Sequence, residues 1–188
     1  MHTLICGVTE SGKTTAAHVL AEMDNEKKTP LIVYDPVLTE TAAGEWPRNS
    51  ALFDDGNKFL SYMERTRKPC AVYVDEAADL FDQAQRENRW ILTRGRHYGF
   101  SVTVICQRPK MVSPSVRNQC ARLLMFRLAN DDRQVIGADY GHSDFNKISL
   151  DRGDFVLAYS GDAAYTRHNI FDLLTRGKRS CTSTLKLP

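Results

Sequence analysis

The stretch Gly7-Val8-Thr9-Glu10-Ser11-Gly12-Lys13-Thr14 matches the pattern G-x-x-x-x-G-K-[ST] at every fixed position. The apolar run Thr3–Cys6 precedes it, and Lys13–Met23 follows with apolar residues near helical spacing. Glycines let a loop turn tightly and point its backbone N–H groups at phosphate oxygens, and the N-terminus of the next helix attracts the same anion. The stretch therefore predicts a phosphate-binding loop between a strand and a helix.

The side chains of this loop predict the binding of ATP together with Mg²⁺. Lys13 can reach the β- and γ-phosphates, and the hydroxyl of Thr14 can bind Mg²⁺. The expected nucleotide contacts are completed by Gly7, Thr9, Glu10, Ser11, Gly12 and Thr15. The alternative is a chance match, which average composition produces in roughly one per cent or fewer of chains of this length.

A second motif is the apolar run Ala71–Val74, which ends in Asp75 and Glu76. Two carboxylates at the end of a buried strand are typical of a Walker-B motif, in which Asp75 holds Mg²⁺ directly or through water. Glu76 would then polarise the attacking water as a general base. The alternative is a strand that leads into an acidic helix start. Small-molecule P-loop kinases generally lack such a glutamate, so Glu76 favours hydrolysis.

Polar residues flank the most strand-like segment, Ser101–Cys106. If this strand lies beside Ala71–Val74, Gln107 faces the γ-phosphate and can sense it, although an ordinary strand-end glutamine is the alternative. Arg94 and Arg96 precede the strand and are candidates for an arginine finger that reaches a neighbouring subunit's γ-phosphate. They can equally be surface cations near a helix end. The choice between the two arginines stays open, and three others compete with them: Arg117, Arg122 and Arg127.

Apolar runs alternate with longer amphipathic stretches, which predicts an α/β fold, a RecA-like P-loop domain with a mostly parallel central sheet flanked by helices. The expected strands are Thr3–Cys6, Leu31–Tyr34, Ala51–Phe53, Ala71–Val74, Ser101–Cys106 and Ala121–Leu128. The expected helices are Lys13–Met23, Asn57–Arg65, Leu80–His97 and Asp131–Ile136, and Phe155–Tyr159 with Tyr165–Ile170 is expected to form a hairpin. We expect one ATPase domain over residues 1–175 and a basic, loosely ordered tail over 176–188.

Composition is that of an ordinary globular chain, with 42% hydrophobic and 26% charged residues in 188. There is no signal peptide and no apolar run of the ~18 residues that a membrane span needs. The five cysteines have no zinc-site spacing; Cys6, Cys70 and Cys106 are expected in the core. These features predict a cytoplasmic protein. Residues 86–133 carry a local charge of +7 and the rest carries −5, which indicates either a polyanion partner or a solvated face.

Taken together, the motifs resemble those of the FtsK–HerA superfamily of DNA-pumping ATPases, and most of all the compact genome-packaging ATPases of internal-membrane phages and related viruses. The resemblance rests on the phosphate loop, on Asp75-Glu76 and on Arg94–Phe100 leading to Cys106–Pro109. Asn118 and the stretches Phe126–Leu128 and Leu150–Val156 are also similar to the family's sequences.

The resemblance implies a homo-oligomeric ring, usually a hexamer, with ATP sites between subunits and double-stranded DNA in a central channel. It also implies a place in the host cytoplasm or on the virion, docked on a capsid vertex protein. Because nothing precedes the first strand and no span is present, a minimal packaging motor is favoured. The alternatives are a P-loop ATPase for filamentous-phage export or plasmid mobilisation with a membrane partner, a slow nucleotide-dependent switch, and a small-molecule kinase. The last is disfavoured by Glu76 and the lack of an obvious lid.

Overall fold

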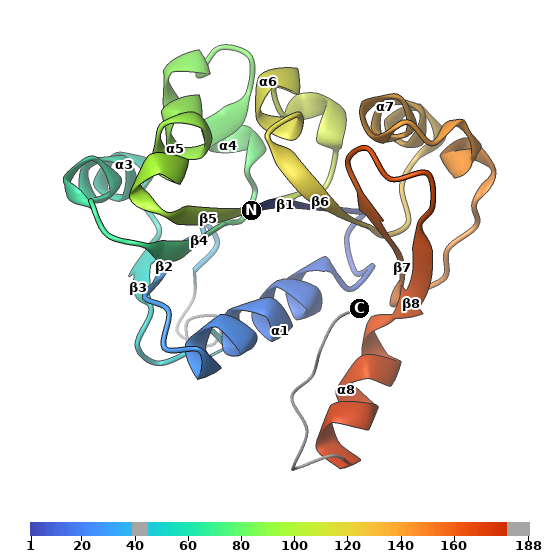
Figure 1. Ribbon diagram of the computed structural model, residues 1–188, viewed down its shortest axis with the longest axis horizontal. Coiled ribbons are helices and arrows are strands. Elements are labelled where there is room, and N and C mark those ends of the chain that lie inside the picture. The colour runs from blue at the N-terminus through green and yellow to red at the C-terminus, as the bar shows by residue number, and fades with distance from the viewer. Residues whose placement is uncertain (39–44, 180–188) are drawn as a thin grey trace.

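A computed structural model describes residues 1–38 and 45–179 of the chain. Within these residues one sheet of eight strands has the order β3-β2-β4-β5-β1-β6-β7-β8 (Figure 1). The strands are β1 His2–Cys6, β2 Leu31–Tyr34, β3 Ala51–Phe53, β4 Cys70–Val74, β5 Phe100–Cys106, β6 Cys120–Met125, β7 Asp154–Tyr159 and β8 Thr166–Asn169. Pairing is parallel from β3 to β6, and β7 and β8 add an antiparallel edge. The predicted α/β class is confirmed.

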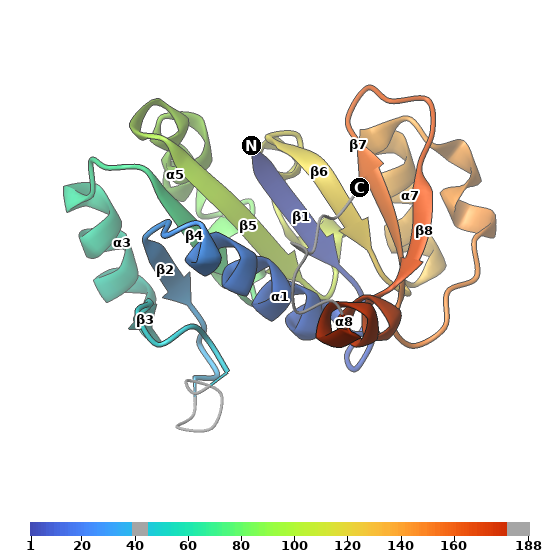
Figure 2. The ribbon, with the colours of Figure 1, turned by 60° about the horizontal axis from the view of Figure 1, so that its bottom comes forward.

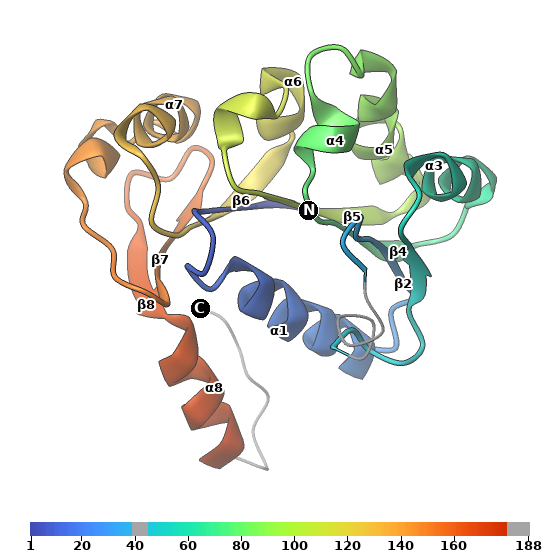
Figure 3. The same ribbon diagram turned by 180° about the vertical axis from the view of Figure 1, so that it is seen from behind.

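Helices cover both faces of the sheet. Helices α1 and α8 lie on one face and the others on the opposite face, as two views from opposite sides show (Figures 1 and 3). Their bounds are α1 Lys13–Glu26, α3 Gly56–Arg65, α4 Ala78–Phe81, α5 Trp90–Thr93, α6 Pro114–Arg117, α7 Asn130–Tyr140 and α8 Ile170–Arg179. Short 3₁₀ turns, η1 Arg86–Arg89, η2 Gly95–Tyr98, η3 Pro109–Met111 and η4 Ser143–Lys147, complete the connections.

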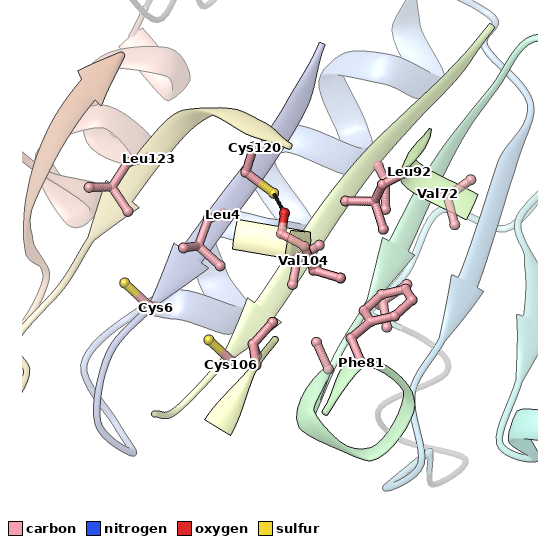
Figure 4. Close-up of a cluster of buried hydrophobic side chains, with 14 of the residues drawn as sticks. Leu4, Cys6, Val72, Phe81, Leu92, Val104, Cys106, Cys120 and Leu123 are labelled. Atoms are coloured by element: carbon pink, nitrogen blue, oxygen red, sulfur yellow. Dashed lines mark hydrogen bonds between the residues drawn. The ribbon is translucent and has the colours of Figure 1, made fainter. Parts of the chain in front are cut away.

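The central strand β1 is buried on both sides, and its side chains alternate between two cores. Leu4 and Cys6 pack into the larger core under α3 to α7, whereas Ile5 packs against α1 and α8. Figure 4 shows Leu4 and Cys6 in the larger core beside Cys106 and Cys120. The described cysteines, Cys6, Cys70, Cys106 and Cys120, are free and buried. The expectation that Cys6, Cys70 and Cys106 belong to the core is confirmed.

The predicted helix Leu80–His97 is wrong. The segment is instead broken into α4, η1, α5 and η2. Polar side chains near the first break bind the backbone in place of helical partners: Asp82 accepts a hydrogen bond from the Gln85 amide (2.8 Å), and Asn88 donates to the Leu80 carbonyl (3.0 Å). Such local bonds compete with a continuous helix.

Other elements begin or end a few residues away from their predicted positions. Strand β6 ends at Met125 rather than Leu128, and α7 runs on to Tyr140, where Gly141 in the left-handed region (φ +79°) ends it. Helix α8 extends beyond residue 175, and residues 180–188 of the expected tail lie outside the described part of the chain. In that described part no helix is long and apolar enough to cross a membrane.

Candidate nucleotide-binding site

Three neighbouring strands bring the predicted motifs to one edge of the sheet. Strand β5 pairs in parallel with β1 on one side and with β4 on the other. The loops that follow these strands therefore leave from the same edge (Figure 2). The phosphate loop follows β1, Asp75 and Glu76 follow β4, and Gln107 follows β5 between them. The expectation that Ser101–Cys106 lies beside the Walker-B strand is confirmed.

Backbone bonds fix the base of the phosphate loop between β5 and β6. The amide of Gly7 donates to the Cys106 carbonyl (3.2 Å), and that of Val8 donates to Arg127 (2.9 Å). A Cβ at position 7 would lie 2.6 Å from Cβ of Phe126, so a side chain here would push the loop off β6. Gly7 therefore provides close packing. The Ser11 amide also has an internal partner, the Val8 carbonyl (3.3 Å), so phosphate contacts are left to the other later amides of the loop.

The later part of the loop lines a cavity of about 330 Å³ at the start of α1. Lys13 is 7% exposed, begins the helix and lines this cavity. The hydroxyl of Ser11 is buried and has no hydrogen-bond partner among the described residues. A buried donor without a partner is costly, and a phosphate oxygen would satisfy it. The residues that line the cavity are Glu10, Gly12, Lys13, Thr14, Thr15, Arg152 and Phe171.

Gln107 connects the phosphate loop to the acidic pair. Its side-chain oxygen accepts a hydrogen bond from the Thr9 hydroxyl (3.2 Å), and its side-chain nitrogen donates to Oε1 of Glu76 (2.7 Å). The amide of one residue thus touches both predicted motifs. A glutamine suits this position because it carries an acceptor and a donor on one planar group.

The backbone at Glu76 is in the left-handed region, with a φ of +42°. Residues other than glycine adopt this conformation at an energetic cost, and such strain is concentrated at functional sites. The turn is held by the Asp75 carboxylate, whose Oδ1 accepts the Glu76 amide (2.8 Å), and by the Ala77 amide, which donates to Ile105 (2.9 Å). The fold therefore fixes where the Glu76 carboxylate lies.

Asp75 has an unusually basic carboxylate. Burial raises its pKa to about 6; the nearby charges of Asp35 and Glu76 add to the rise, while the Glu76 amide and the Lys13 ammonium oppose it. A cation beside this carboxylate would relieve the repulsion and restore its charge. Asp35, at the end of β2, is itself buried and accepts hydrogen bonds from the Val37 amide (3.0 Å) and the Trp46 indole (3.5 Å).

The donors present fit Mg²⁺ held jointly by protein and nucleotide. No group of three or more His, Cys, Asp or Glu side chains capable of holding a metal occurs in residues 1–38 and 45–179. Mg²⁺ at nucleotide sites takes one or two carboxylates plus phosphates and keeps several waters. The Thr14 hydroxyl, which lines the cavity, and the Asp75 carboxylate are donors of the required kind.

The candidate arginines occupy different edges of the sheet. Arg94 and Arg96 are exposed and precede β5, whose seven residues separate them from Gln107. At about 3.3 Å per residue this is roughly 20 Å, beyond the reach of an arginine side chain. The structure thus keeps both arginines away from the candidate site of the same chain. Arg127 is exposed and follows β6 on the same edge as the phosphate loop.

Two competing arginines have internal partners. Arg117 is buried, pairs with Asp139 (2.6 Å) and donates to the carbonyls of Pro109 and Val112. Arg122 donates to the Thr3 hydroxyl (3.0 Å). These contacts give both arginines structural roles.

Three residues near the site were missed by the motif analysis: Asp35, Arg152 and Phe171. Asp35 carries a weak signal, since it ends an apolar strand as Asp75 does. Arg152 lies in Leu150–Val156, a stretch similar to the family, but nothing in the sequence places it at the loop, and Phe171 carries no signal; 138 residues or more separate the two from Thr14. Only the folding of β7, β8 and α8 against the loop brings them to the cavity.

Solved structures share this architecture. The DNA-packaging ATPase B204 of Sulfolobus turreted icosahedral virus is similar with a TM-score of 0.76 and 17% identity, over 89% of this chain and 96% of B204. The chain has the fold of this packaging ATPase. The same protein from Sulfolobus turreted icosahedral virus 2, bound to ATP-γS, gives a TM-score of 0.74 at 17% identity over 89% and 96% of the two chains.

A plasmid protein is also similar: the pCW3 conjugation coupling protein TcpA, with a TM-score of 0.70 and 14% identity over 89% of this chain and 59% of TcpA. No family model and no curated protein matches the chain. The resemblance drawn from the motifs is confirmed at the level of the fold.

Proposed function

We propose that the chain is an ATP-hydrolysing motor that translocates double-stranded DNA and packages a viral genome into a preformed capsid. The hydrogen-bond chain from Thr9 through Gln107 to Glu76 is the observation that carries the hydrolytic part. It joins the phosphate-binding loop to a carboxylate that can accept a proton. A small-molecule kinase transfers phosphate to a substrate hydroxyl and does not need a carboxylate that activates water. We therefore do not favour this alternative.

In the proposed site the later amides of the phosphate loop and the Lys13 ammonium bind the β- and γ-phosphates. Thr14 and Asp75 hold Mg²⁺, which when bound neutralises charge on the phosphates. Glu76 accepts a proton from a water molecule as the water oxygen bonds to the γ-phosphorus. The bond from the γ-phosphorus to the β–γ bridging oxygen then breaks, and ADP and phosphate result. Gln107 holds the Glu76 carboxylate in place for this step.

The placement of the arginines supports a ring in this proposal. Arg94 and Arg96 lie across the sheet from their own site, so either can act as a finger only on a neighbouring subunit's γ-phosphate. The family resemblance implies a hexameric ring, in which each site lies at a subunit boundary. Hydrolysis in one subunit would then be coupled to the position of the next.

The DNA partner is supported by the similarity to B204, which is matched over nearly its whole length and is described as a DNA-packaging ATPase. The charge of residues 86–133 is weaker support, since Arg108 and Lys110 pair with Asp131, and Arg117 pairs with Asp139. We further propose action in the host cytoplasm or on the virion, with a capsid vertex protein as docking partner.

A second candidate function is plasmid mobilisation or export with a membrane partner, favoured by the similarity to the conjugation coupling protein TcpA. Both candidates move nucleic acid with ATP. A slow nucleotide-dependent switch would not.

Displacement of a third strand from a DNA triplex tests translocation directly. Wild-type protein with Mg·ATP is expected to release a triplex-forming oligonucleotide from a long linear duplex, and Glu76→Gln is expected to release none. Absence of release under conditions where the wild type hydrolyses ATP would contradict the motor and favour the switch.

A further inference from the structure

The cavity at the phosphate loop continues toward the antiparallel edge of the sheet. Strands β4 and β5, which carry Glu76 and Gln107, lie on one side of β1, and β6, β7 and β8 lie on the other. If Glu76 acts on the γ-phosphate, the triphosphate points toward β4 and β5. The nucleoside must then extend the opposite way. The two cavity residues on that side are Arg152 and Phe171.

Backbone bonds build this wall onto the phosphate loop. The amide of Gly153 donates to the Ser11 carbonyl (3.0 Å), and the Ile170 amide donates to the Gly153 carbonyl (2.9 Å). The turn at Gly153 and the start of α8 therefore keep a fixed position relative to the loop. Figure 2 shows the start of α8 beside the start of α1.

The position of the Phe171 ring depends on a glycine. Gly153 has a φ of +86°, and a Cβ there would lie 2.5 Å from Cδ2 of Phe171. The ring thus lies directly on the turn, in space that any other residue at 153 would fill. The Arg152 guanidinium lies over the same ring at 5.9 Å from its centroid.

The first turn of α8 is fixed by its own side-chain bonds. Oδ1 of Asn169 accepts the amides of Phe171 (3.0 Å) and Asp172 (3.4 Å), which caps the helix. Nδ2 of Asn169 donates to Asp154 (2.9 Å), which also binds Arg167 (2.7 Å). Phe171 nevertheless remains 39% exposed. The exposed part of this ring lines the cavity, and a flat aromatic surface is suited to stacking with a flat ligand.

We propose that Phe171 and Arg152 form the nucleoside end of the ATP site. The Phe171 ring packs against the base, as aromatic side chains do with any nucleobase. The Arg152 guanidinium pairs with the α-phosphate, beside Thr15 of the phosphate loop. This inference rests on the proposed ATP site and adds to it the residues that recognise the part of the nucleotide away from the reaction.

Calorimetric titration of the full chain with Mg·ADP and with inorganic triphosphate separates the two roles. We expect Phe171→Ala to weaken ADP binding about 10-fold and to leave triphosphate binding unchanged. Arg152→Ala should weaken both about 10-fold, since it loses a charged phosphate contact. The matched controls are Met111→Ala, an exposed apolar residue, and Arg65→Ala, an exposed arginine on α3; both should bind as wild type.

Wild-type affinity of Phe171→Ala for ADP would overturn the base-packing role, and so would an equal loss of triphosphate binding. Failure of the wild type to bind ADP would overturn the proposed function together with this inference. Photolabelling of the wild type with 8-azido-ATP avoids any effect of substitution on folding. The labelled peptide is expected to contain Phe171, and labelling confined to other segments would contradict the proposal.

Discussion

The side-chain nitrogen of Gln107 lies 2.7 Å from Oε1 of Glu76 and donates a hydrogen bond to it. The two residues end adjacent parallel strands, and the strained backbone at Glu76 turns its carboxylate to the edge where Gln107 emerges. The other end of the Gln107 amide accepts from Thr9 in the phosphate loop. The amide of Gln107 therefore links the phosphate loop to the Glu76 carboxylate, the general base of the proposed mechanism.

Replacing Gln107 by alanine is expected to lower kcat for ATP hydrolysis about 10- to 100-fold, because Glu76 loses the donor that orients it. The Kd for Mg·ADP should change less than about 2-fold, since the phosphate contacts of the loop are intact. Steady-state kinetics and calorimetry measure the two quantities. Gln134→Ala, an exposed glutamine on α7, is the matched control. An unchanged kcat would show that the hydrogen bond has no part in hydrolysis.

Substitutions of Glu76 separate its chemical role from its backbone strain. Glu76→Gln should lower kcat by at least ~10²-fold while nucleotide binding persists, because the side chain can no longer accept a proton. Glu76→Gly should be more stable than Glu76→Ala by about 1 kcal/mol, since only glycine adopts a φ of +42° without strain. Thermal unfolding without nucleotide tests the second point. Intact hydrolysis in Glu76→Gln would refute the assignment of the base.

Mixing two inactive variants tests whether an arginine acts between subunits. Subunits with Arg94→Ala or Arg96→Ala keep the proposed base, Glu76, but lack one candidate finger. Subunits with Glu76→Gln keep both arginines but lack the base. We expect one of the two mixtures to hydrolyse ATP faster than either component, because a finger accelerates hydrolysis by roughly 10³ or more. Arg65→Ala mixed with Glu76→Gln should show only the activity of the Arg65 variant. If neither mixture recovers activity, the finger lies elsewhere.

Arg117 is expected to stabilise the fold and not to act as a finger, so its replacement should lower stability. Arg117→Ala removes the ion-pair partner of the partly exposed Asp139 and the buried donor to the Val112 carbonyl, while the Pro109 carbonyl keeps the Val112 amide. Losses of this kind cost about 1–3 kcal/mol. Urea unfolding measures the change, with exposed Arg65→Ala as control. A stability equal to wild type would return Arg117 to the list of candidate fingers.

Stability is expected to fall below neutral pH because of His2. Burial lowers its pKa, the Leu92 bond opposes the shift, and the Arg96 charge adds to it. Both nitrogens of the neutral ring have hydrogen-bond partners: Nε2 donates to the Leu92 carbonyl (2.8 Å), and Nδ1 accepts a hydrogen bond from the Val102 amide (3.0 Å). Below the ordinary value of 6.5 the unfolded chain gains a proton that the folded chain does not. The free energy of unfolding then decreases by at most about 1.4 kcal/mol per pH unit.

The measurement is urea unfolding between pH 8 and pH 5 for wild type and His2→Gln. Burial also lowers the pKa of His18 and His168, so both proteins lose stability as pH falls. The wild type should lose more. Equal slopes would mean that His2 is protonated in the folded protein.

Much of the sheet was predictable because its central strands, such as β1, β2 and β4, are buried along their length and so read as short apolar runs. Leu31–Tyr34 and Ala51–Phe53 match β2 and β3, and the hairpin of β7 and β8 was expected from its turn. Leu80–His97 failed because apolar spacing cannot reveal side chains that bind the backbone, as Asp82 and Asn88 do. Strand order likewise lies outside what a single sequence contains.

The candidate site was predictable where its residues are adjacent in sequence, as in the phosphate loop and Asp75-Glu76. The place of Gln107 at the site was predictable once the two strands were assumed to be neighbours, whereas its hydrogen bond to Glu76 was not predicted. The place of Arg152 and Phe171 at the cavity was not predictable, because it depends on how α8 packs beside the loop; the family-like stretch Leu150–Val156 contains Arg152 but does not indicate a nucleotide contact.

Steady-state ATP hydrolysis with and without long double-stranded DNA, at several protein concentrations, tests the central claim most directly. The wild type should hydrolyse ATP, DNA should stimulate it, and the rate should rise more steeply than protein concentration as rings form. Lys13→Ala should show no turnover in the same assay. Wild-type turnover by Lys13→Ala would contradict the site, and hydrolysis indifferent to DNA at every concentration would contradict the DNA motor.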